Sequence, residues 1–123
     1  MQIKVGKQAT RTVYPDIEGN LDLPEAERFG IVLEKPSQSR LNEVATEYVT
    51  DEGGAVRQKV NLSAITRSYI KRLVNAPEVD FEGGDTRTLK VSDLFSYDTF
   101  DETMKAIDRA IGEMRTEGTD TKN

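Results

Sequence analysis

Residues 61–74, NLSAITRSYIKRLV, constrain the fold of this chain more than any other stretch, because their apolar side chains recur at three- and four-residue steps. This spacing is the period of an α-helix and predicts one here. At about 100° per residue the apolar positions cover roughly half of the helical wheel, so the helix is expected to pack against more than one neighbour. Its polar side carries Arg67, Lys71 and Arg72, which are either a partner-binding patch or a solvated face near the helix C-terminus.

Residues 28–34 form the clearest predicted strand, because the apolar residues Phe29, Ile31 and Leu33 occupy every second position. The positions between them hold Arg28, Gly30, Val32 and Glu34. Weaker patterns predict short strands at residues 2–5, 9–14 and 86–91, and leave residues 55–60 open as either a linker or a strand. Two acidic stretches rich in turn-forming residues, 16–27 and 78–85, are predicted as loops. In the first loop, Leu21 and Leu23 are expected to reach the core, and residues 24–27 are expected to form one helical turn.

Two more helices are predicted on either side of the central one. The first starts at a cap on Ser37 or Ser39 and runs to about residue 50, where Gly53 and Gly54 follow as terminating residues. The last starts at Asp98 and runs to about residue 115, ahead of a flexible tail at residues 116–123. The elements together predict a single α+β domain over residues 1–115. It would contain a small antiparallel sheet, mainly from the N-terminal half, with three helices packed on one face.

An internal similarity relates two glycine-containing segments. Residues 49–57, VTDEGGAVR, match residues 79–87, VDFEGGDTR, at the valine, the glutamate, both glycines and the arginine. The flanking helical segments do not match, so the similarity is interpreted as two independent uses of the same turn chemistry rather than as a structural repeat.

The composition excludes several classes of function. The 123-residue chain contains no cysteine and no histidine, which removes disulfides, thiol chemistry and the commonest general base and metal ligand. Its formal net charge of −5 argues against nucleic-acid binding, since phosphate contacts need a basic surface. No stretch is long and apolar enough for a membrane span, and the N-terminus lacks the apolar core of a signal peptide. The cytoplasm is therefore the expected compartment.

No group of residues predicts catalysis, a cofactor or a metal. Asp80, Glu82 and Asp85 surround two glycines, but they lack the alternating oxygen ligands of a calcium loop. Paired carboxylates such as Asp16 and Glu18 suit glycoside hydrolysis only within an aromatic-lined cleft, and the chain is poor in aromatic residues. The glycine pairs match no phosphate-binding loop. A helix-turn-helix over residues 39–74 would need an unusually long connection.

The order of features resembles the small tail-assembly proteins of long-tailed phages, the tail assembly chaperones encoded beside the tape-measure gene. The resemblance extends over about residues 1–115 and is carried by the segments RFGIVLEKPSQSRLNEV, D-x-E-G-G and DLFSYDTFDETMKAIDRAI. It implies a non-enzymatic protein that escorts a helical tape-measure protein until tail-tube subunits replace it. It also implies self-association, so that a homo-oligomer is an expected state. It identifies no site residues, because it contains no diagnostic motif.

A partner surface is predicted on the exposed edges of the first and last helices. The candidate contacts, in addition to the three cations above, are Leu41, Tyr48, Phe100, Met104, Ile107 and Ile111. The competing interpretation is that these apolar residues form the core of the domain itself. Besides the chaperone-like function with a tape-measure or tail-tube partner, two alternatives remain. One is a structural subunit of a phage tail or particle whose β-segments pair between chains. The other is a small acidic regulator that binds a basic protein.

Overall fold

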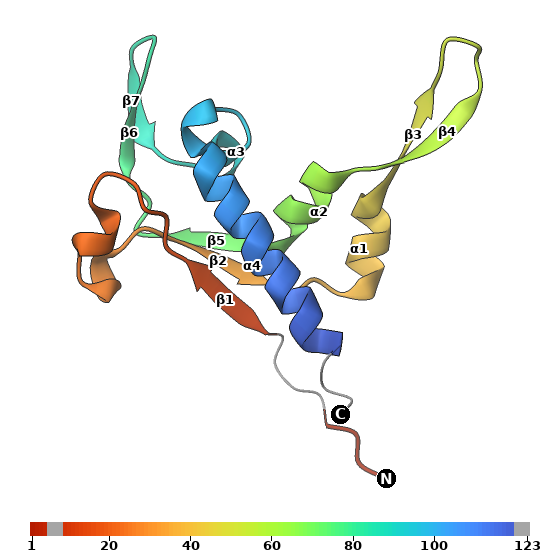
Figure 1. Ribbon diagram of the computed structural model, residues 1–123, viewed down its shortest axis with the longest axis horizontal. Coiled ribbons are helices and arrows are strands. Elements are labelled where there is room, and N and C mark those ends of the chain that lie inside the picture. Colours follow the sequence, from red (N-terminus) through yellow and green to blue (C-terminus); the bar gives the residue numbers. More distant parts are fainter. Residues whose placement is uncertain (5–8, 120–123) are drawn as a thin grey trace.

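The computed structural model describes residues 1–4 and 9–119, apart from the side chains of residues 47 and 117–119, and it has an α+β fold (Figure 1). A three-stranded antiparallel sheet has the order β1-β2-β5, formed by Thr10–Val13, Gly30–Glu34 and Ile70–Val74. Two separate β-hairpins are β3 (Thr46–Thr50) with β4 (Val56–Val60), and β6 (Glu78–Phe81) with β7 (Asp85–Thr88). The α-helices are α1 (Gln38–Ala45), α2 (Leu62–Tyr69), α3 (Val91–Leu94) and α4 (Asp101–Thr119). The predicted fold class is confirmed.

Strand β2 lies at the centre of the core. Residues 30–33 are all buried, because β1 and β5 flank the strand and α4 crosses one face of the sheet (Figure 1). Gly30 has no room for a side chain, since an added Cβ would lie 2.8 Å from Thr12 Cγ2. The strand predicted at residues 28–34 and the helix predicted from about residue 98 are therefore both confirmed. The core cluster consists of Phe29, Ile31, Leu33, Tyr69, Leu89, Leu94, Phe100, Ile107, Ala110, Ile111 and Met114.

The predicted central helix is correct only in its first half. Asn61 caps α2, because its Oδ1 accepts a hydrogen bond of 2.9 Å from the amide of Ala64. After Tyr69 the chain becomes β5, which pairs with β2 so that Leu73 lies opposite Ile31. The second half of the prediction fails for a physical reason. The backbone groups on the second side of a buried strand need partners, and β5 supplies them from a distant part of the sequence.

The helix predicted to reach about residue 50 also ends early. Ser37 caps α1 as expected, with Arg40 N donating to Ser37 Oγ over 3.1 Å. The helix stops at Ala45, and residues 46–50 form β3. This segment, TEYVT, consists largely of β-branched and aromatic residues, which favour strands over helices. Residues 55–60, left open as linker or strand, provide its antiparallel partner β4.

Both segments of the internal similarity form β-hairpins. Val49 pairs with Arg57 across the first hairpin, and Val79 pairs with Arg87 across the second. Gly54 has φ +83°, and Gly84 has φ +112°, values that a residue with a side chain rarely adopts. The same acid-Gly-Gly turn thus closes two hairpins. Residues 78–85 are correspondingly a hairpin rather than the predicted loop, and the strand predicted at 86–91 is β7, which ends at Thr88.

The remaining differences lie in the N-terminal segments and at the C-terminus. Residues 1–4 have no regular secondary structure, and Val5 of the strand predicted at 2–5 lies outside the described residues. The strand predicted at 9–14 is β1. In the predicted loop after it, η1 (Asn20–Asp22) and η2 (Glu25–Glu27) are 3-10 turns, and η2 confirms the expected helical turn. The tail predicted from residue 116 is helical through Thr119, and residues 120–123 lie outside the described part.

Candidate functional site

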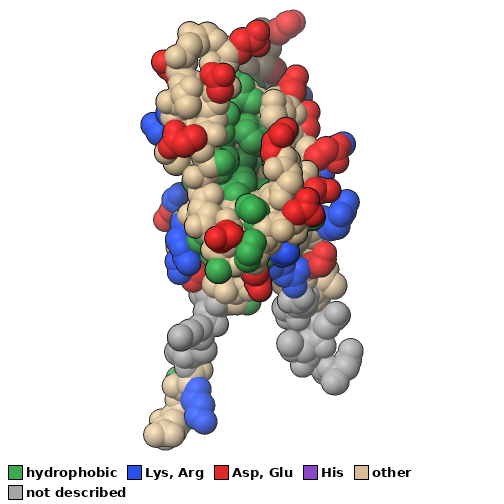
Figure 2. Space-filling model, turned by 90° about the vertical axis from the view of Figure 1, so that its left-hand side faces the viewer, with side chains coloured by type: hydrophobic (Ala, Val, Ile, Leu, Met, Phe, Trp, Pro, Cys, Tyr) green, Lys and Arg blue, Asp and Glu red, His purple; other side chains and the backbone are tan. Residues whose placement is uncertain are grey.

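A groove of about 590 Å³ lies on the side of the molecule away from the β3–β4 hairpin. Three segments form it: the loop between β1 and β2, the β5–β6 connection with β6, and the 3-10 turn η3 (Asp98–Phe100) that precedes α4. Figure 2 looks onto this side and shows a strip of hydrophobic side chains between two walls, with carboxylates along their edges. We call this feature the acid-rimmed groove. Its lining residues are Ile17, Glu18, Asn20, Leu23, Glu27, Phe29, Asn75, Pro77, Glu78, Val79, Asp80, Thr99 and Phe100.

The floor of the groove is apolar and continuous with the core. Phe29 and Phe100 are buried members of the core cluster, and Ile17 and Val79 pack against that cluster while remaining partly exposed. Leu23 is 42% exposed at the groove wall, so the prediction that it reaches the core is wrong. Leu21, 41% exposed, is not buried either. The short 3-10 turns place these two side chains outside the core. The result is a solvent-exposed apolar surface that a partner can cover.

Two asparagines hold the groove walls in place. The buried Asn20 amide donates to the carbonyls of Pro15 and Phe29, both over 2.9 Å, and its Oδ1 accepts from Phe29 N over 2.8 Å. Asn75 donates from the other wall to the carbonyls of Ala26 and Arg28, over 2.9 and 3.0 Å. These hydrogen bonds satisfy backbone groups of the loop that have no partner in a helix or a sheet. They hold the loop in place as a wall of the groove.

Among the described residues, those other than glycine that have a positive φ angle both lie in the groove walls. Glu18 has φ 47° and Asn75 has φ 51°, and both line the groove. Asparagine adopts this left-handed conformation readily, whereas glutamate does so at a cost in free energy. Backbone strain of this kind tends to gather at binding sites.

The rim of the groove is negatively charged. Glu18, Glu27, Glu78 and Asp80 are exposed lining residues, and no lysine or arginine is among the lining residues. Glu78 accepts a hydrogen bond of 2.7 Å from Thr88 Oγ1, which fixes one of these carboxylates at the base of the β6–β7 hairpin. An apolar floor between carboxylates suits an apolar segment that carries lysine or arginine at its edges.

The wall formed by β6 is anchored by an ion pair behind it. Arg87 of β7 donates two hydrogen bonds of 2.7 Å to the carboxylate of Asp93, which also accepts one of 2.8 Å from Lys90 N. The guanidinium of Arg87 is the main cause that lowers the pKa of Asp93 to about 2, and Asp93 in turn raises the pKa of Arg87. The same guanidinium lies 4.2 Å from the ring centre of Phe81, and the Phe81 and Tyr97 rings are 5.2 Å apart. The β6–β7 hairpin is therefore fixed to the body.

The β3–β4 hairpin, which we call the arm, has no comparable anchor among its described side chains. It projects from α1 and α2 on the opposite side of the molecule from the β6–β7 hairpin (Figure 1). Directly paired residues share a face, so Tyr48, Val56 and Val60 lie on one face. They are 69%, 64% and 59% exposed. Arg57 and Lys59 lie on the other face, and Arg57 forms a 3.7 Å ion pair with Asp51 at the arm's own tip.

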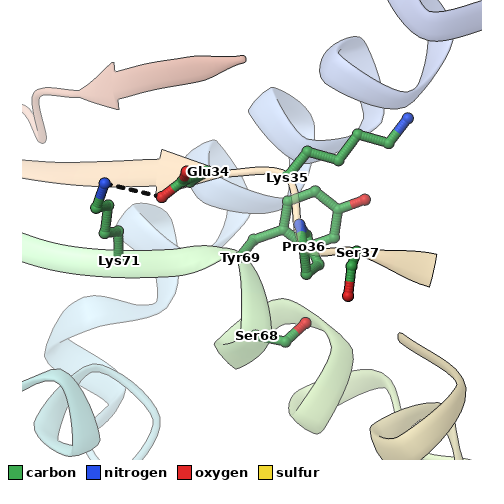
Figure 3. A pocket seen from close by; sticks show the side chains of 7 residues that line it. All are labelled: Glu34, Lys35, Pro36, Ser37, Ser68, Tyr69 and Lys71. Carbon is green, nitrogen blue, oxygen red and sulfur yellow. Dashed lines mark ion pairs between the residues drawn. The ribbon is translucent and has the colours of Figure 1, made fainter. Parts of the chain in front are cut away.

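The predicted cationic patch does not form one surface. Lys71 Nζ lies 2.9 Å from Glu34 Oε2, beside a small polar pocket where β2 ends and β5 begins (Figure 3). The Arg67 guanidinium lies 5.9 Å from the ring centre of Phe95, and Arg72 lies opposite Val32 in the sheet. The helix that was expected to group these cations ends at Tyr69, so the alternation of the strand separates Lys71 from Arg72.

The predicted apolar contacts divide between the core and the surface. Ile107 and Ile111 are 0% and 6% exposed and Met104 and Leu41 pack against the core cluster, so these residues serve the domain's own packing. Phe100 is buried too but lines the groove, and Tyr48 is exposed on the arm. Sequence reasoning missed the groove's acidic rim and the arm. A usable signal existed for the arm, since TEYVT and VRQKV flank an acid-Gly-Gly turn.

Comparisons with protein-family models, curated proteins and solved structures find no match for this chain. The described residues contain no helix that is both long and apolar enough to cross a membrane. They also contain no group of three or more acidic, histidine or cysteine side chains arranged to hold a metal ion. The groove and the arm are therefore the features on which a functional proposal rests.

Proposed function

We propose that this protein is a non-enzymatic phage tail-assembly protein that holds a helical segment of a protein partner in the acid-rimmed groove. The observation that carries the proposal is the combination of an apolar floor, four carboxylates on the rim and walls fixed by Asn20 and Asn75. A fixed groove of this kind costs little conformational entropy on binding. The amphipathic helix that fits it has apolar side chains along one face and cations at the edges of that face.

The resemblance to tail assembly chaperones supports a tape-measure-like protein as the partner, and the bacterial host cytoplasm as the place of action. The absence of histidine and cysteine from the sequence supports a role without catalysis, and no cofactor is part of the proposal. The paired groups Arg87 and Asp93 are explained by their structural role in holding β6–β7, so their shifted pKa values do not call for a catalytic function.

The arm favours a second candidate, a structural subunit of a phage tail or particle. A two-stranded hairpin with an uncovered apolar face is marginally stable alone and gains stability by contact with another chain. Such a contact repeated between copies would build a ring or a tube. The two candidates differ in what fills the groove, a helix from a different protein or a segment of this one.

Binding of designed peptides tests the first candidate. A fluorescent helical peptide with leucines on one face and lysines beside them should bind, whereas the same peptide with glutamates in place of lysines should not. The double change Glu27→Lys and Asp80→Lys, which we call the rim variant, should weaken binding at least about tenfold, a loss of about 1.4 kcal/mol. Fluorescence anisotropy measures both dissociation constants.

A matched control reverses two exposed carboxylates outside the groove, Glu43 on α1 and Glu52 at the arm tip, and should bind the lysine peptide with nearly unchanged affinity. Equal weakening in both variants would show that net charge alone attracts the peptide and would contradict the groove as the site. The phage assignment has its own test, purification of the tagged protein from its native host with identification of bound chains by mass. A bound tape-measure-like protein supports it, and recovery of nucleic acid or of this chain alone would overturn it.

A further inference from the structure

A small polar pocket of about 330 Å³ lies at the opposite end of the sheet from the acid-rimmed groove (Figure 3). The groove lies where β2 begins and β5 ends, whereas the pocket lies where β2 ends and β5 begins. We call it the Tyr69 pocket. Its volume is at the lower end of the range for small-molecule sites, about 300–1,000 Å³. The lining residues are Glu34, Lys35, Pro36, Ser37, Ser68, Tyr69 and Lys71.

The Tyr69 hydroxyl is a polar group without a protein partner in the wall of this pocket. Tyr69 belongs to the core cluster and is only 1% exposed. None of the described residues forms a hydrogen bond with its hydroxyl, yet the described part contains no fully buried side-chain oxygen or nitrogen that lacks a partner. The hydroxyl therefore belongs to the small accessible surface of Tyr69, in the pocket that this residue lines. Buried tyrosines usually direct their hydroxyl to a hydrogen-bond partner, and here that position is left to a ligand.

The groups around this hydroxyl favour an anion. Lys71 is paired with Glu34 over 2.9 Å, so these two charges offset each other. Lys35 forms no ion pair with any described residue, and it gives the pocket an excess of positive charge. Figure 3 shows the hydroxyl on the side of Lys35 and Ser37, away from Lys71.

The start of α1 adds to this preference. Ser37 caps the helix, and its Oγ accepts a hydrogen bond from Arg40 N, which leaves the hydrogen of the serine hydroxyl available to a ligand. The N-terminus of a helix also attracts negative charge, because the partial charges of its free amide groups are positive. The acid-rimmed groove is the opposite kind of site, with four carboxylates and no lysine or arginine in its lining.

We propose that the Tyr69 pocket binds a small oxyanion, a phosphate or carboxylate group. The Tyr69 hydroxyl donates a hydrogen bond to one oxygen of the anion, Ser37 donates a second, and Lys35 supplies the balancing charge. The site goes beyond the proposed function and does not depend on it. The protein then holds an anion at one end of the sheet and a cationic helix at the other.

Titration with sodium phosphate tests the site, with the amide signals in NMR spectra as the readout. At constant ionic strength the signals of residues 34–37 and 68–71 should shift and saturate. The dissociation constant should be on the order of 1 mM, since a few hydrogen bonds in a small open pocket give weak binding. Sodium chloride over the same range should give no saturable change.

A parallel titration with sodium acetate distinguishes the two sources of an oxyanion. Saturation by phosphate alone supports a phosphoryl ligand, and saturation by acetate supports a carboxylate ligand. No saturable shift with either salt would overturn the proposal. Equal shifts with glycerol, which is neutral, would also overturn it, because they would show that charge plays no part.

Two variants with matched controls assign the binding to this pocket. Tyr69→Phe removes only the hydroxyl, and Lys35→Gln removes the balancing charge. Each should weaken phosphate binding at least about fivefold, as expected for the loss of one hydrogen bond or charge contact. The controls make the same changes on the arm, Tyr48→Phe and Lys59→Gln, and should bind phosphate like the wild type. Equal weakening in a variant and its control would overturn the pocket as the site.

Thermal unfolding separates a ligand-binding hydroxyl from a structural one. Without an added anion, Tyr69→Phe should unfold at nearly the wild-type temperature, because the hydroxyl bonds to no described residue. Phosphate should raise the thermal midpoint of the wild type more than that of the variant, since binding to the folded state stabilises it. A lower midpoint for the variant without anion, together with an equal gain from phosphate, would assign the hydroxyl to the fold and overturn the proposal.

Discussion

Among the described residues, Asp93 is the acidic residue whose side chain is buried. Its side chain is 6% exposed and accepts two bonds from Arg87 and one from the amide of Lys90. A buried carboxylate is costly unless its oxygens are satisfied, and here the donors come from β7 and from the start of α3. One residue thus joins the wall of the groove to the helix that leads into α4.

Replacing Asp93 with asparagine should destabilise the fold by about 2 kcal/mol at neutral pH, because it removes two charge-assisted hydrogen bonds. The pKa of Asp93 is lowered to about 2 in the folded state, from an ordinary value of 3.8. Its stabilising contribution is therefore complete above about pH 4 and is lost as the pH falls toward 2. Urea unfolding at several pH values should show the gap between wild type and variant closing over this interval.

A surface ion pair provides the control for this pH experiment. Arg40 and Glu43 on α1 lie 3.3 Å apart with side chains 59% and 64% exposed, and such pairs contribute little. The change Glu43→Gln should shift stability by less than about 0.5 kcal/mol at any pH. A gap for Asp93→Asn that stays constant down to pH 2 would show that the effect is steric rather than due to charge.

At the scale of elements, the two hairpins share a turn but differ in support. The β6–β7 hairpin is held by the Arg87–Asp93 pair and by the contact of Phe81 with Tyr97. The arm extends from α1 with its apolar face uncovered. Local opening depends on such anchoring contacts rather than on the turn sequence, so the two hairpins should open with different free energies.

Amide hydrogen exchange should detect this difference. In dilute protein the amides of β3 and β4 should exchange at least about tenfold faster than those of β6 and β7, since a contact network worth more than 1.4 kcal/mol holds the second hairpin closed. Equal exchange of both hairpins in dilute protein would contradict the anchoring argument.

The elements also show what the sequence could predict. Periodicity located β2, α4 and the starts of α1 and α2, because each depends on a local pattern of burial or on a cap. It failed at Ala45 and Tyr69, where helix gives way to strand. The strand after Tyr69 is determined by pairing with Gly30–Glu34, a partner some 40 residues away in the sequence. The sequence showed that the two segments that wall the groove, 16–27 and 78–85, are acidic. That they face each other across an apolar floor depends on tertiary packing.

At the scale of the whole molecule, net charge and the exposed apolar face of the arm have opposite effects on association between copies. The chain carries 22 acidic and 17 basic residues, so two copies repel one another at long range. The structural-subunit candidate instead requires contact between copies at short range, through the uncovered apolar face of the arm. The two effects have different ranges, and salt therefore separates them.

If copies associate through the arm, as the structural-subunit candidate requires, association should strengthen as the salt concentration rises. The Debye length is about 30 Å at 0.01 M, about 10 Å at 0.1 M and about 3 Å at 1 M ionic strength. Raising the salt to about 0.1 M and then to about 1 M screens the repulsion between whole molecules, whereas it leaves the apolar contact of the arm in place. The weight-average mass in sodium chloride, measured by sedimentation, should therefore rise with the salt concentration. A mass that falls from the lowest salt onward would show that the net charge of −5 does not oppose assembly.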